Sequence, residues 1–509
     1  MNVEPDLPPP TVLLDADRQS YIGKPTSKKG KWQKFVSFIW DSDYYEKSDA
    51  ERKLVFKLDC FMLTAMTIGW WLKNLDQNNL SNAYVSGMKE DLNIQANQYT
   101  YMGTIYNAVV AAMQIPSSFI VMKVRPSWFL AACEVGWGIF TFAQAGAQSY
   151  QAMYGFRFCI ALFESFYYPI GFFILGSWYT RPELAKRIGL WFIAGPAGSA
   201  FSGFLQAAIY KNLDGINGIA GWRYLYIVCG AMTVPCGITL FFLVPDFPEN
   251  TKVWYLSEEE KALAKERVAR NGAQAMKGKI DGSVIISALK DWKFWILVPF
   301  YCIYGFAVQN GTQFGIYLKA YKYSVTLRNV MPSLMYIIQC PCILIYCYIS
   351  DRTTRIQRGW IMLGPLIWGI FPTAVLAFWA PSNSLRVFAF MANGSLYITP
   401  VFYAWVAEMC GHKTEMRAFI TGATSCLFYA FNAWLPAIVF LQTDGPRFKK
   451  GFRTTFSCCV ASVIFVIVII LMRRREIRQE NNKMVDETPS EAAGGHGQSE
   501  RNGDIEEKP

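Results

Sequence analysis

Long apolar blocks alternate with short polar connections over most of the chain. Blocks of about 20 residues are long enough to cross a hydrocarbon core of about 30 Å as helices. A helix also satisfies its own backbone hydrogen bonds, which lipid cannot do. The pattern therefore predicts an all-α membrane protein with about 12 transmembrane helices. The predicted spans are 55–74, 99–122, 128–147, 151–175, 188–210, 223–243, 294–318, 330–349, 359–379, 386–407, 417–441 and 452–472.

These spans form two groups of six, separated by a polar central loop. Within this loop, Ser257 to Glu260 fits a capping box that opens a helix running to about Ala269. Two bundles joined in this way can rock against each other around a site at mid-membrane. The predicted parts are an N-terminal tail (1–53), a six-helix bundle (54–243), the central loop (244–293), a second six-helix bundle (294–472) and a C-terminal tail (473–509) too polar to fold.

The charge distribution predicts the orientation of the chain. The net charge is +11, but Lys and Arg gather in tails and connecting loops, which is a topology signal rather than a nucleic-acid-binding pattern. The polar start of the chain lacks the apolar core of a cleaved signal peptide. Both ends are predicted to be cytoplasmic, from Lys24, Lys28, Lys29, Lys31, Lys34, Arg473, Arg474, Arg475 and Arg478.

Cysteine and histidine usage gives no sign of a metal or cofactor site. The 13 cysteines fall mostly inside apolar spans without metal-type spacing, and the chain has two histidines. Disulfides, a zinc site and a cofactor are therefore not expected. An embedded acyltransferase or hydrolase would need a nucleophile with a base or a metal cluster. The chain is accordingly not predicted to be an enzyme.

The first candidate site lies where span one meets a polar stretch. On a helix Lys73, Asp76 and Gln77 are three and four residues apart and are expected to share a face, with Asn74 beside them. Ionisable groups at membrane depth are expensive unless paired or hydrated, which makes them functional candidates. The alternative is that these residues already lie in the outer loop. Lys73, Asn74 and Gln77 are predicted to bind substrate, and Asp76 to carry a proton.

The second candidate site is in span four. Arg157 and Glu164 are seven residues apart, which places them two turns apart on the same helix face. Glu164 stands alone in an apolar and aromatic stretch, where desolvation raises the proton affinity of a carboxylate. Glu164 is therefore a candidate proton carrier and Arg157 a candidate substrate ligand. The alternative for Glu164 is a structural ion pair with a neighbouring span.

Two further features concern movement of the bundles. The loop between spans eight and nine carries Asp351, Arg352 and Arg355, which are predicted to lock helix ends through charge-assisted hydrogen bonds and so to act in gating. A solvated loop is the alternative. Span five is rich in small residues, which allow the close helix packing of a sliding interface. They are Gly195, Ala197, Gly198, Ser199, Ala200, Ser202 and Gly203.

From Lys57 to Phe452 the chain resembles the anion:cation symporter family of the major facilitator superfamily, in its fungal branch that carries vitamins and small carboxylates. It looks most like the pantothenate transporters of that branch. The segments that carry this resemblance are 82–92, 176–179, 217–223, Arg417, 432–436 and 446–451.

The resemblance implies roles for particular residues. In bacterial sugar-acid members an Asp-Arg pair in span one and an Arg and a Glu in span four handle protons and the anionic substrate, which correspond by position to Asp76, Arg157 and Glu164. This chain departs from the pattern at Gln77, where the wider family commonly has Arg. Lys73, one turn earlier, is the expected replacement for that positive charge.

The leading hypothesis is a proton-coupled importer of a carboxylate vitamin, with pantothenate first. Biotin, allantoate, nicotinate or a similar organic anion is the alternative substrate. The expected partners are a small organic anion, protons and the lipid bilayer, and the expected state is a monomer in the plasma membrane, or alternatively in the vacuolar membrane. A non-transporting nutrient sensor with the same fold is the alternative of another class. It should have enlarged, structured tails.

Overall fold

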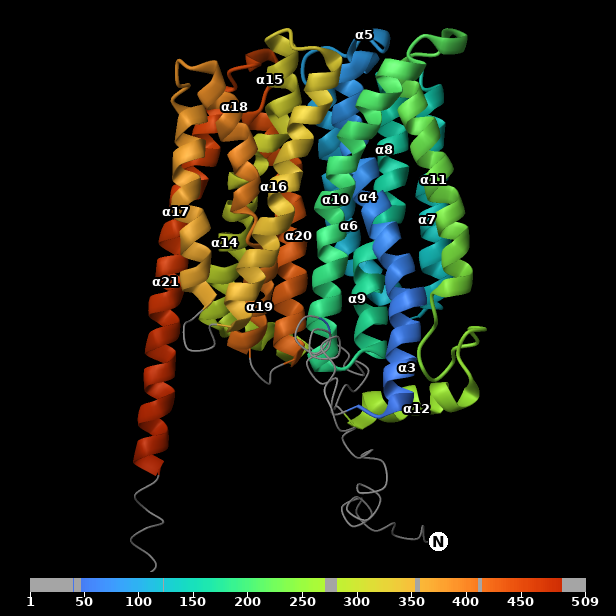
Figure 1. Cartoon of the computed structure of the whole chain (residues 1–509). Helices are drawn as coiled ribbons and strands as arrows, with labels where there is room; N and C mark the ends of the chain where they lie inside the picture. Colours follow the sequence, from blue (N-terminus) through green and yellow to red (C-terminus); the bar gives the residue numbers. More distant parts are fainter. Residues whose placement is uncertain are drawn as a thin grey trace, which may run out of the picture.

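The computed structural model describes residue 40 and residues 47–121, 123–270, 282–352, 358–410 and 414–487. The elements formed by these residues are helices, and they stand side by side along one direction (Figure 1). The first half contains α3 (Asp49–Leu58), η1 (Asp59–Leu63), α4 (Thr64–Ala83), η2 (Tyr84–Met88), α5 (Lys89–Asp91), α6 (Gln98–Val121), α7 (Pro126–Ala143), η3 (Gln144–Gly146), α8 (Tyr150–Glu164), α9 (Tyr167–Trp178), α10 (Arg181–Leu213), η4 (Ile216–Gly218) and α11 (Gly221–Leu243).

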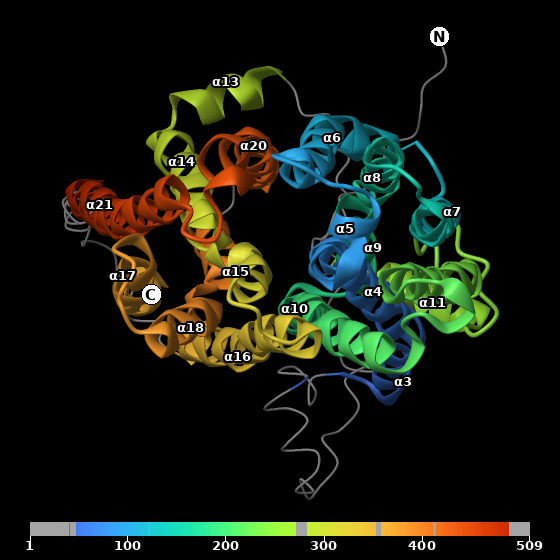
Figure 2. The same cartoon turned by 90° about the horizontal axis from the view of Figure 1, so that it is seen from above.

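The second half repeats this arrangement, and seen from above the two halves lie side by side (Figure 2). Along the chain, the two halves are connected by a segment that contains α12 (Glu258–Arg270) and α13 (Gly282–Lys290). The second half contains α14 (Trp292–Ala307), η5 (Gln309–Gln313), α15 (Phe314–Ala320), α16 (Val325–Arg352), α17 (Arg358–Ala377), α18 (Asn383–Ala392), η6 (Asn393–Leu396), α19 (Thr399–Cys410), α20 (Thr414–Val439), η7 (Gln442–Asp444) and α21 (Lys449–Glu487).

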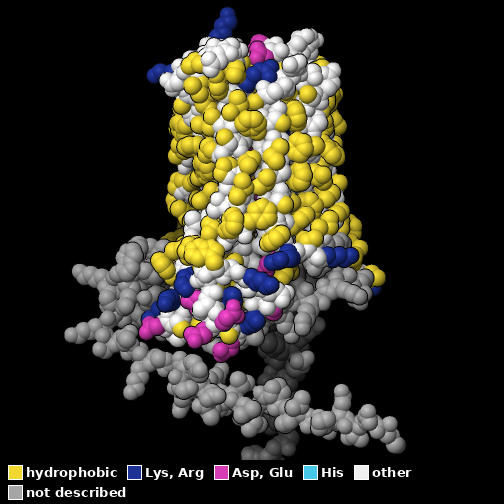
Figure 3. Space-filling model, turned by 90° about the vertical axis from the view of Figure 1, so that its right-hand side faces the viewer, with side chains coloured by type: hydrophobic (Ala, Val, Ile, Leu, Met, Phe, Trp, Pro, Cys, Tyr) yellow, Lys and Arg dark blue, Asp and Glu magenta, His cyan; other side chains and the backbone are white. Residues whose placement is uncertain are grey.

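The outer surface is that of a membrane protein. Nine helical stretches within the described residues are long and apolar enough to span a bilayer. The predicted spans 99–122, 128–147 and 294–318 fall on α6, α7 and α14 with α15, which complete the pattern. An apolar belt covers the middle of the molecule, and charged side chains gather at its two ends (Figure 3). The predicted all-α membrane fold is thus confirmed.

The sequence predicted the central helix well and two helix ends poorly. Ser257 and Glu260 form the expected capping box, each side chain bonding the other's backbone N–H (3.2 and 3.0 Å). Span one was placed at 55–74, but α4 continues to Ala83, because neighbouring helices satisfy its polar residues inside the protein. The tail expected to be disordered from 473 begins as a continuation of α21, which ends at Glu487.

The two bundles meet along two seams. α10 packs against α4 in its own bundle and against α16 in the other, and α6 packs against α20. Small residues make the first seam possible, as predicted for span five. A Cβ on Gly198 would collide with the backbone carbonyl of Trp71, and one on Gly203 with Ser333 and the backbone of Asn329. Close approach within and between the bundles therefore depends on glycines in α10.

The ends of the molecule differ in how the bundles are joined. We call the end that bears α12 and the end of α21 the terminal face, and the other end the opposite face (Figure 1). At the opposite face Lys319 of the second bundle forms an ion pair with Glu90 of the first bundle at 2.8 Å. Asn329 also donates to Ser86 at 2.9 Å. The bundles are therefore fastened at the opposite face.

Candidate functional site

Glu164, at the end of α8, is the centre of a buried polar cluster. Its Oε2 atom accepts hydrogen bonds from the Gln77 amide at 2.9 Å and from the Tyr106 hydroxyl at 2.6 Å. The Lys73 ammonium lies 3.6 Å from the same oxygen, and both side chains of this ion pair are almost fully buried. Span one and span four thus supply one cluster, which contains Lys73, Gln77 and Glu164.

Arg157 lies two turns before Glu164 and reaches the same tyrosine. Its guanidinium lies 4.6 Å from the centre of the Tyr106 ring, in cation-π geometry. The residue is buried, and no carboxylate of the described residues lies within ion-pair distance of it. Its Nε atom has no hydrogen-bond partner there, and neither has Glu164 Oε1. Two buried cations, Lys73 and Arg157, therefore lie near Glu164.

Asp76 points elsewhere. Its Oδ2 atom accepts from Thr233 of α11 at 3.2 Å, and its Oδ1 atom accepts from Asn79 at 3.2 Å. Asp76 therefore has other hydrogen-bond partners than Lys73 and Gln77, although it still interacts electrostatically with Glu164 and Arg157 and lies near the same cluster. Successive residues on a helix are about 100° apart, so Gln77 and Asp76 address different neighbours. The alternative of an outer loop is also excluded, because Lys73 and Asp76 are both buried within α4.

Asn74 contributes to packing with α10 rather than to the Glu164 cluster. Its amide donates to the Trp70 carbonyl at 2.8 Å, and it lies against Gly195. Asn78, one turn later, was missed by the sequence analysis. It donates to Ser199 of α10 at 2.7 Å and accepts from Tyr336 of α16 at 2.9 Å. α4 thus carries a polar link to the second bundle.

The Glu164 cluster also adjoins the second bundle, along the seam of α6 and α20. Tyr429 of α20 packs against the hydrophobic core of the first bundle, close enough to Glu164 and Tyr106 to interact with them electrostatically. Asn107, next to Tyr106, donates to the Asn432 carbonyl of α20 at 3.1 Å. No pattern in the sequence singled out Tyr106 or Tyr429, because a tyrosine in an apolar span usually belongs to the core.

The predicted gating loop is described only in part. Asp351 and Arg352 are the last residues of α16, and the Arg352 guanidinium lies 5.2 Å from the Tyr348 ring centre. Arg355 lies outside the described residues. Among the described residues, no cluster of three His, Cys, Asp or Glu side chains is arranged to hold a metal ion. The residues of the Glu164 cluster interact through charges and hydrogen bonds.

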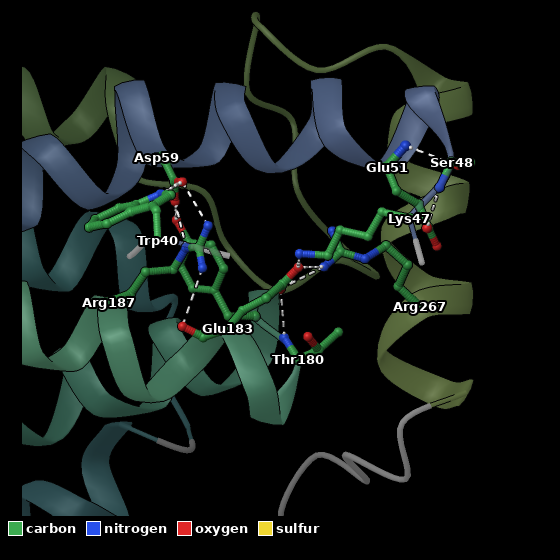
Figure 4. A network of polar contacts seen from close by, with 10 residues as sticks. Trp40, Lys47, Ser48, Glu51, Asp59, Thr180, Glu183, Arg187 and Arg267 are labelled. Carbon is green, nitrogen blue, oxygen red and sulfur yellow. Dashed lines mark hydrogen bonds and ion pairs between the residues drawn. The ribbon is translucent and has the colours of Figure 1, made fainter. Parts of the chain in front are cut away.

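The terminal face carries a second, larger charge network (Figure 4). Asp59 accepts from Arg187 at 2.7 and 2.8 Å and from Trp40 at 2.8 Å. Glu183 accepts from Arg267 of α12 at 2.6 Å and pairs with Lys47 at 2.5 Å. Burial alone would raise the pKa of Glu183, but the two cations outweigh it and lower the pKa. The network ties the N-terminal segment and α12 to α10.

Comparisons with known proteins agree with this architecture. The chain is 33% identical over 409 residues to the MFS transporter PfmaC of Pestalotiopsis fici, covering 79% of this chain and 76% of the relative. It is 30% identical over 448 residues to the vitamin H transporter of Saccharomyces cerevisiae, covering 85% and 73%. It is 28% identical over 414 residues to the pantothenate transporter liz1 of Schizosaccharomyces pombe, covering 81% and 80%.

A solved structure shares the fold. The bacterial homologue of the human lysosomal transporter Spinster, in an inward-facing and occupied conformation, matches with a TM-score of 0.57 at 14% identity, over 82% of this chain and 96% of that one. The Major Facilitator Superfamily model matches residues 61–436. The match takes in both bundles and the whole Glu164 cluster. The chain therefore belongs to the Major Facilitator Superfamily and is a multi-pass membrane transporter rather than an enzyme.

Proposed function

We propose that this transporter imports a small carboxylate vitamin together with protons, and that pantothenate is its substrate. The observation that carries the proposal is the buried Lys73–Glu164 pair beside Arg157, a buried cation without a carboxylate partner among the described residues. The proposed location is the plasma membrane, with the terminal face in the cytoplasm. The basic residues before span one and after span twelve support this orientation.

The charge balance of the cluster explains why it would take an anion. Asp76 interacts electrostatically with Glu164 and Arg157. When Asp76 carries its proton, the two cations Lys73 and Arg157 and the one acid Glu164 leave about one positive charge, which a substrate carboxylate neutralises. At an effective dielectric constant near 20, opposite charges 4 Å apart attract each other by about 4 kcal/mol. Arg157 is therefore the first anchor for a substrate carboxylate, and its planar donor groups suit bidentate binding.

Protonation of Glu164 would couple the two solutes. While Glu164 is charged, it competes with the substrate carboxylate for Lys73, which lies 3.6 Å from it. A proton on Glu164 removes this competition, so that Lys73 and Arg157 can both hold the substrate. Loss of the proton restores the ion pair and favours release of the substrate. The anion and the proton then bind and leave together, which is what symport requires.

The relatives support the class of substrate. Two of them are named for vitamin H and for pantothenate, and both vitamins carry one carboxylate. Biotin is therefore the second candidate substrate, and allantoate, nicotinate or a similar organic anion follows.

Uptake measurements in a yeast strain that lacks its own vitamin carriers test the proposal. Cells expressing the wild-type chain should accumulate labelled pantothenate, faster in acidic than in neutral medium, and a protonophore should abolish the accumulation. Unlabelled biotin added in excess shows whether the site accepts both vitamins. Uptake of neither vitamin, with the protein at the cell surface, would contradict the proposed substrate class. Uptake that ignores the protonophore would contradict proton coupling alone.

A further inference from the structure

A further carboxyl group is buried in the first bundle, next to α4. Glu134, in the middle of α7, has no exposed surface, and neither of its carboxyl oxygens has a hydrogen-bond partner among the described residues. An ionised carboxylate taken out of water without partners costs several kcal/mol. Glu134 takes no part in the hydrogen bonds or the ion pair of the Glu164 cluster, so the presence of an acid at this buried position needs a separate explanation.

The surroundings of Glu134 leave room for its carboxyl group. Gly69 of α4 faces it, and a Cβ at Gly69 would lie 2.6 Å from Glu134 Oε2 and would collide with the Tyr167 hydroxyl. On the α11 side, a Cβ at Gly237 would lie 2.8 Å from the Val135 amide nitrogen. Glycines on two neighbouring helices thus let the backbones close around the acid.

The polar neighbours do not stabilise a negative charge on Glu134. The Tyr167 hydroxyl of α9 donates its hydrogen to the Met66 carbonyl at 2.7 Å, so toward Glu134 it is an acceptor. The Cys236 thiol of α11 lies beside the carboxyl group, but a thiol is a weak donor. Asp76 of α4, the remaining titratable group that acts on Glu134, would repel the charge. These neighbours favour a neutral, protonated Glu134.

The other buried acids of the bundle differ in this respect. Asp76 accepts from Thr233 and Asn79, and Glu164 accepts from Gln77 and Tyr106, so each has donors that stabilise a carboxylate. Glu134 alone of these three lacks them. Its position is also different. It faces Gly69, which precedes Asp76 by seven residues, so it lies about 10 Å closer to the terminal face along α4.

We propose that Glu134 is a proton-relay site between Asp76 and the terminal face. The proposal rests on proton coupling by this transporter and deepens it. In the relay, the O–H bond of the protonated Glu134 breaks first, and its proton passes to water at the terminal face. The O–H bond of Asp76 then breaks, and its proton passes, through water that enters between the two side chains, to the Glu134 carboxylate. Each proton lost leaves a carboxylate behind, and no other reactant is consumed.

Reconstituted protein with Glu134→Gln tests this role. Gln keeps the shape but binds no exchangeable proton, so uptake of labelled pantothenate driven by a pH gradient should fall by about tenfold or more, equivalent to about 1.4 kcal/mol. Exchange of labelled for unlabelled pantothenate without a gradient should persist, which also shows that the variant is folded. Glu134→Asp keeps a carboxyl group and should restore part of the gradient-driven uptake.

An infrared comparison supplies a readout that does not depend on transport. The difference between the wild-type and Glu134→Gln spectra at neutral pH should contain the carbonyl band of one protonated acid, which the variant lacks. Absence of such a band from the difference spectrum, or gradient-driven uptake by Glu134→Gln at the wild-type rate, would overturn the relay. A wild type in which the gradient drives no uptake would overturn the proposed function and the relay together, so the two failures are distinguishable.

Discussion

At the scale of single residues, proton coupling depends on which donors surround each oxygen of the buried Glu164 carboxyl group. Glu164 Oε2 lies within reach of Lys73, Gln77 and Tyr106, whereas Oε1 has no partner among the described residues. The donors around Oε2 therefore stabilise the charged carboxylate, while Oε1 is the position at which a proton can bind. A group that can hold either state with its neighbours in place is suited to carrying protons.

Lys73→Ala should raise the apparent KM for pantothenate about tenfold or more, since loss of about 1.4 kcal/mol of binding free energy gives that factor. The reason is that Lys73 supplies one of the two buried cations, and Gln77 cannot replace it. Lys73→Arg keeps the charge and is the matched control. Initial uptake rates over a range of substrate concentrations, normalised to protein at the cell surface, provide the measurement. An unchanged KM in the alanine variant would show that Arg157 holds the substrate without help.

Glu164→Gln should abolish accumulation driven by a pH gradient and leave exchange of labelled for unlabelled substrate partly intact. Gln imitates the protonated acid and still accepts from Gln77 and Tyr106, so the site keeps its shape but cannot release a proton. Both activities are measured in the same proteoliposomes. Equal loss of both would mean that Glu164 binds the substrate or supports the fold instead.

At the scale of helices, α10 is the element on which the seam with α16 depends. It contacts α4 within its bundle and α16 across the molecule, and the glycines that face these helices are what let it approach both. The first turn of α10 also carries Glu183, which belongs to the charge network of the terminal face. One helix therefore connects the bundle interface to the N-terminal segment and α12.

Gly203→Ala should slow transport, while Gly189→Ala, in the same helix, should have little effect. A Cβ at Gly203 would collide with Ser333 and the Asn329 backbone of α16, but a Cβ at Gly189 meets no atom within 4 Å. Overpacking of this kind costs about 1–3 kcal/mol, enough to disfavour the conformation in which α10 and α16 touch by about 5- to 150-fold. Maximal uptake rates of the two variants make the comparison, and equal rates would show that this contact is not part of the transport cycle.

The Glu183 network should make the protein sensitive to acid. The pKa of Glu183 is lowered in the folded state, so its contribution to stability is present above the unfolded pKa, about 4.3, and is lost as pH falls through the lower folded value. Glu183→Gln should lower Tm in detergent at about pH 7, because Arg267 and Lys47 lose a charged partner. The gap in Tm between the two proteins should close on acidification. A gap that is constant with pH would assign the loss to packing.

At the scale of the whole molecule, the number of protons sets the driving force. If one proton accompanies one monoanion, no net charge moves, and two pH units provide about 2.7 kcal/mol, or about a hundredfold gradient. A second proton makes the cycle carry one positive charge inward, so each 100 mV adds about 2.3 kcal/mol. Two buried acids with different hydrogen-bond donors, Asp76 and Glu164, make the second scheme available.

Transport of a monoanion should therefore be electrogenic in the wild type and electroneutral in any Asp76→Asn variant that remains active. Asn can accept from Thr233 as Asp76 does, but it carries no proton. Currents induced by pantothenate in proteoliposomes on a solid support measure the charge that moves, with label uptake in parallel. A wild type that takes up label without current would leave room for one proton only.

At the opposite face, contacts between the two bundles hold that end of the molecule closed. The Lys319–Glu90 pair joins α15 to α5 there, and the break at Gly87, with φ at +120°, turns α5 out of the line of α4. Glycine adopts this conformation without strain, whereas other residues do not. A fastened opposite face, together with a glycine-lined seam between α10 and α16, is what a structure closed on that side requires.

The sequence by itself determined the membrane fold, the division into two bundles, the capped helix of the central loop and the two spans that carry the Glu164 cluster. These follow from local properties, namely the length of apolar blocks, the cap residues and isolated charges in apolar surroundings. Glu134 is likewise an isolated charge in an apolar block, 128–147, but the sequence analysis did not select it as a candidate. Isolation in an apolar span is therefore informative wherever it occurs.

Only the tertiary structure decided which neighbour each polar side chain meets. The rotation of α4 directs Lys73 and Gln77 to α8 and Asp76 to α11, and the packing of α6 against α20 brings Tyr106 and Tyr429 to Glu164. Such contacts join residues far apart in the chain. They depend on helix rotation and on which helices are adjacent, and a hydropathy pattern contains neither. Whether a buried charge is paired, shared or left without donors is therefore settled by packing.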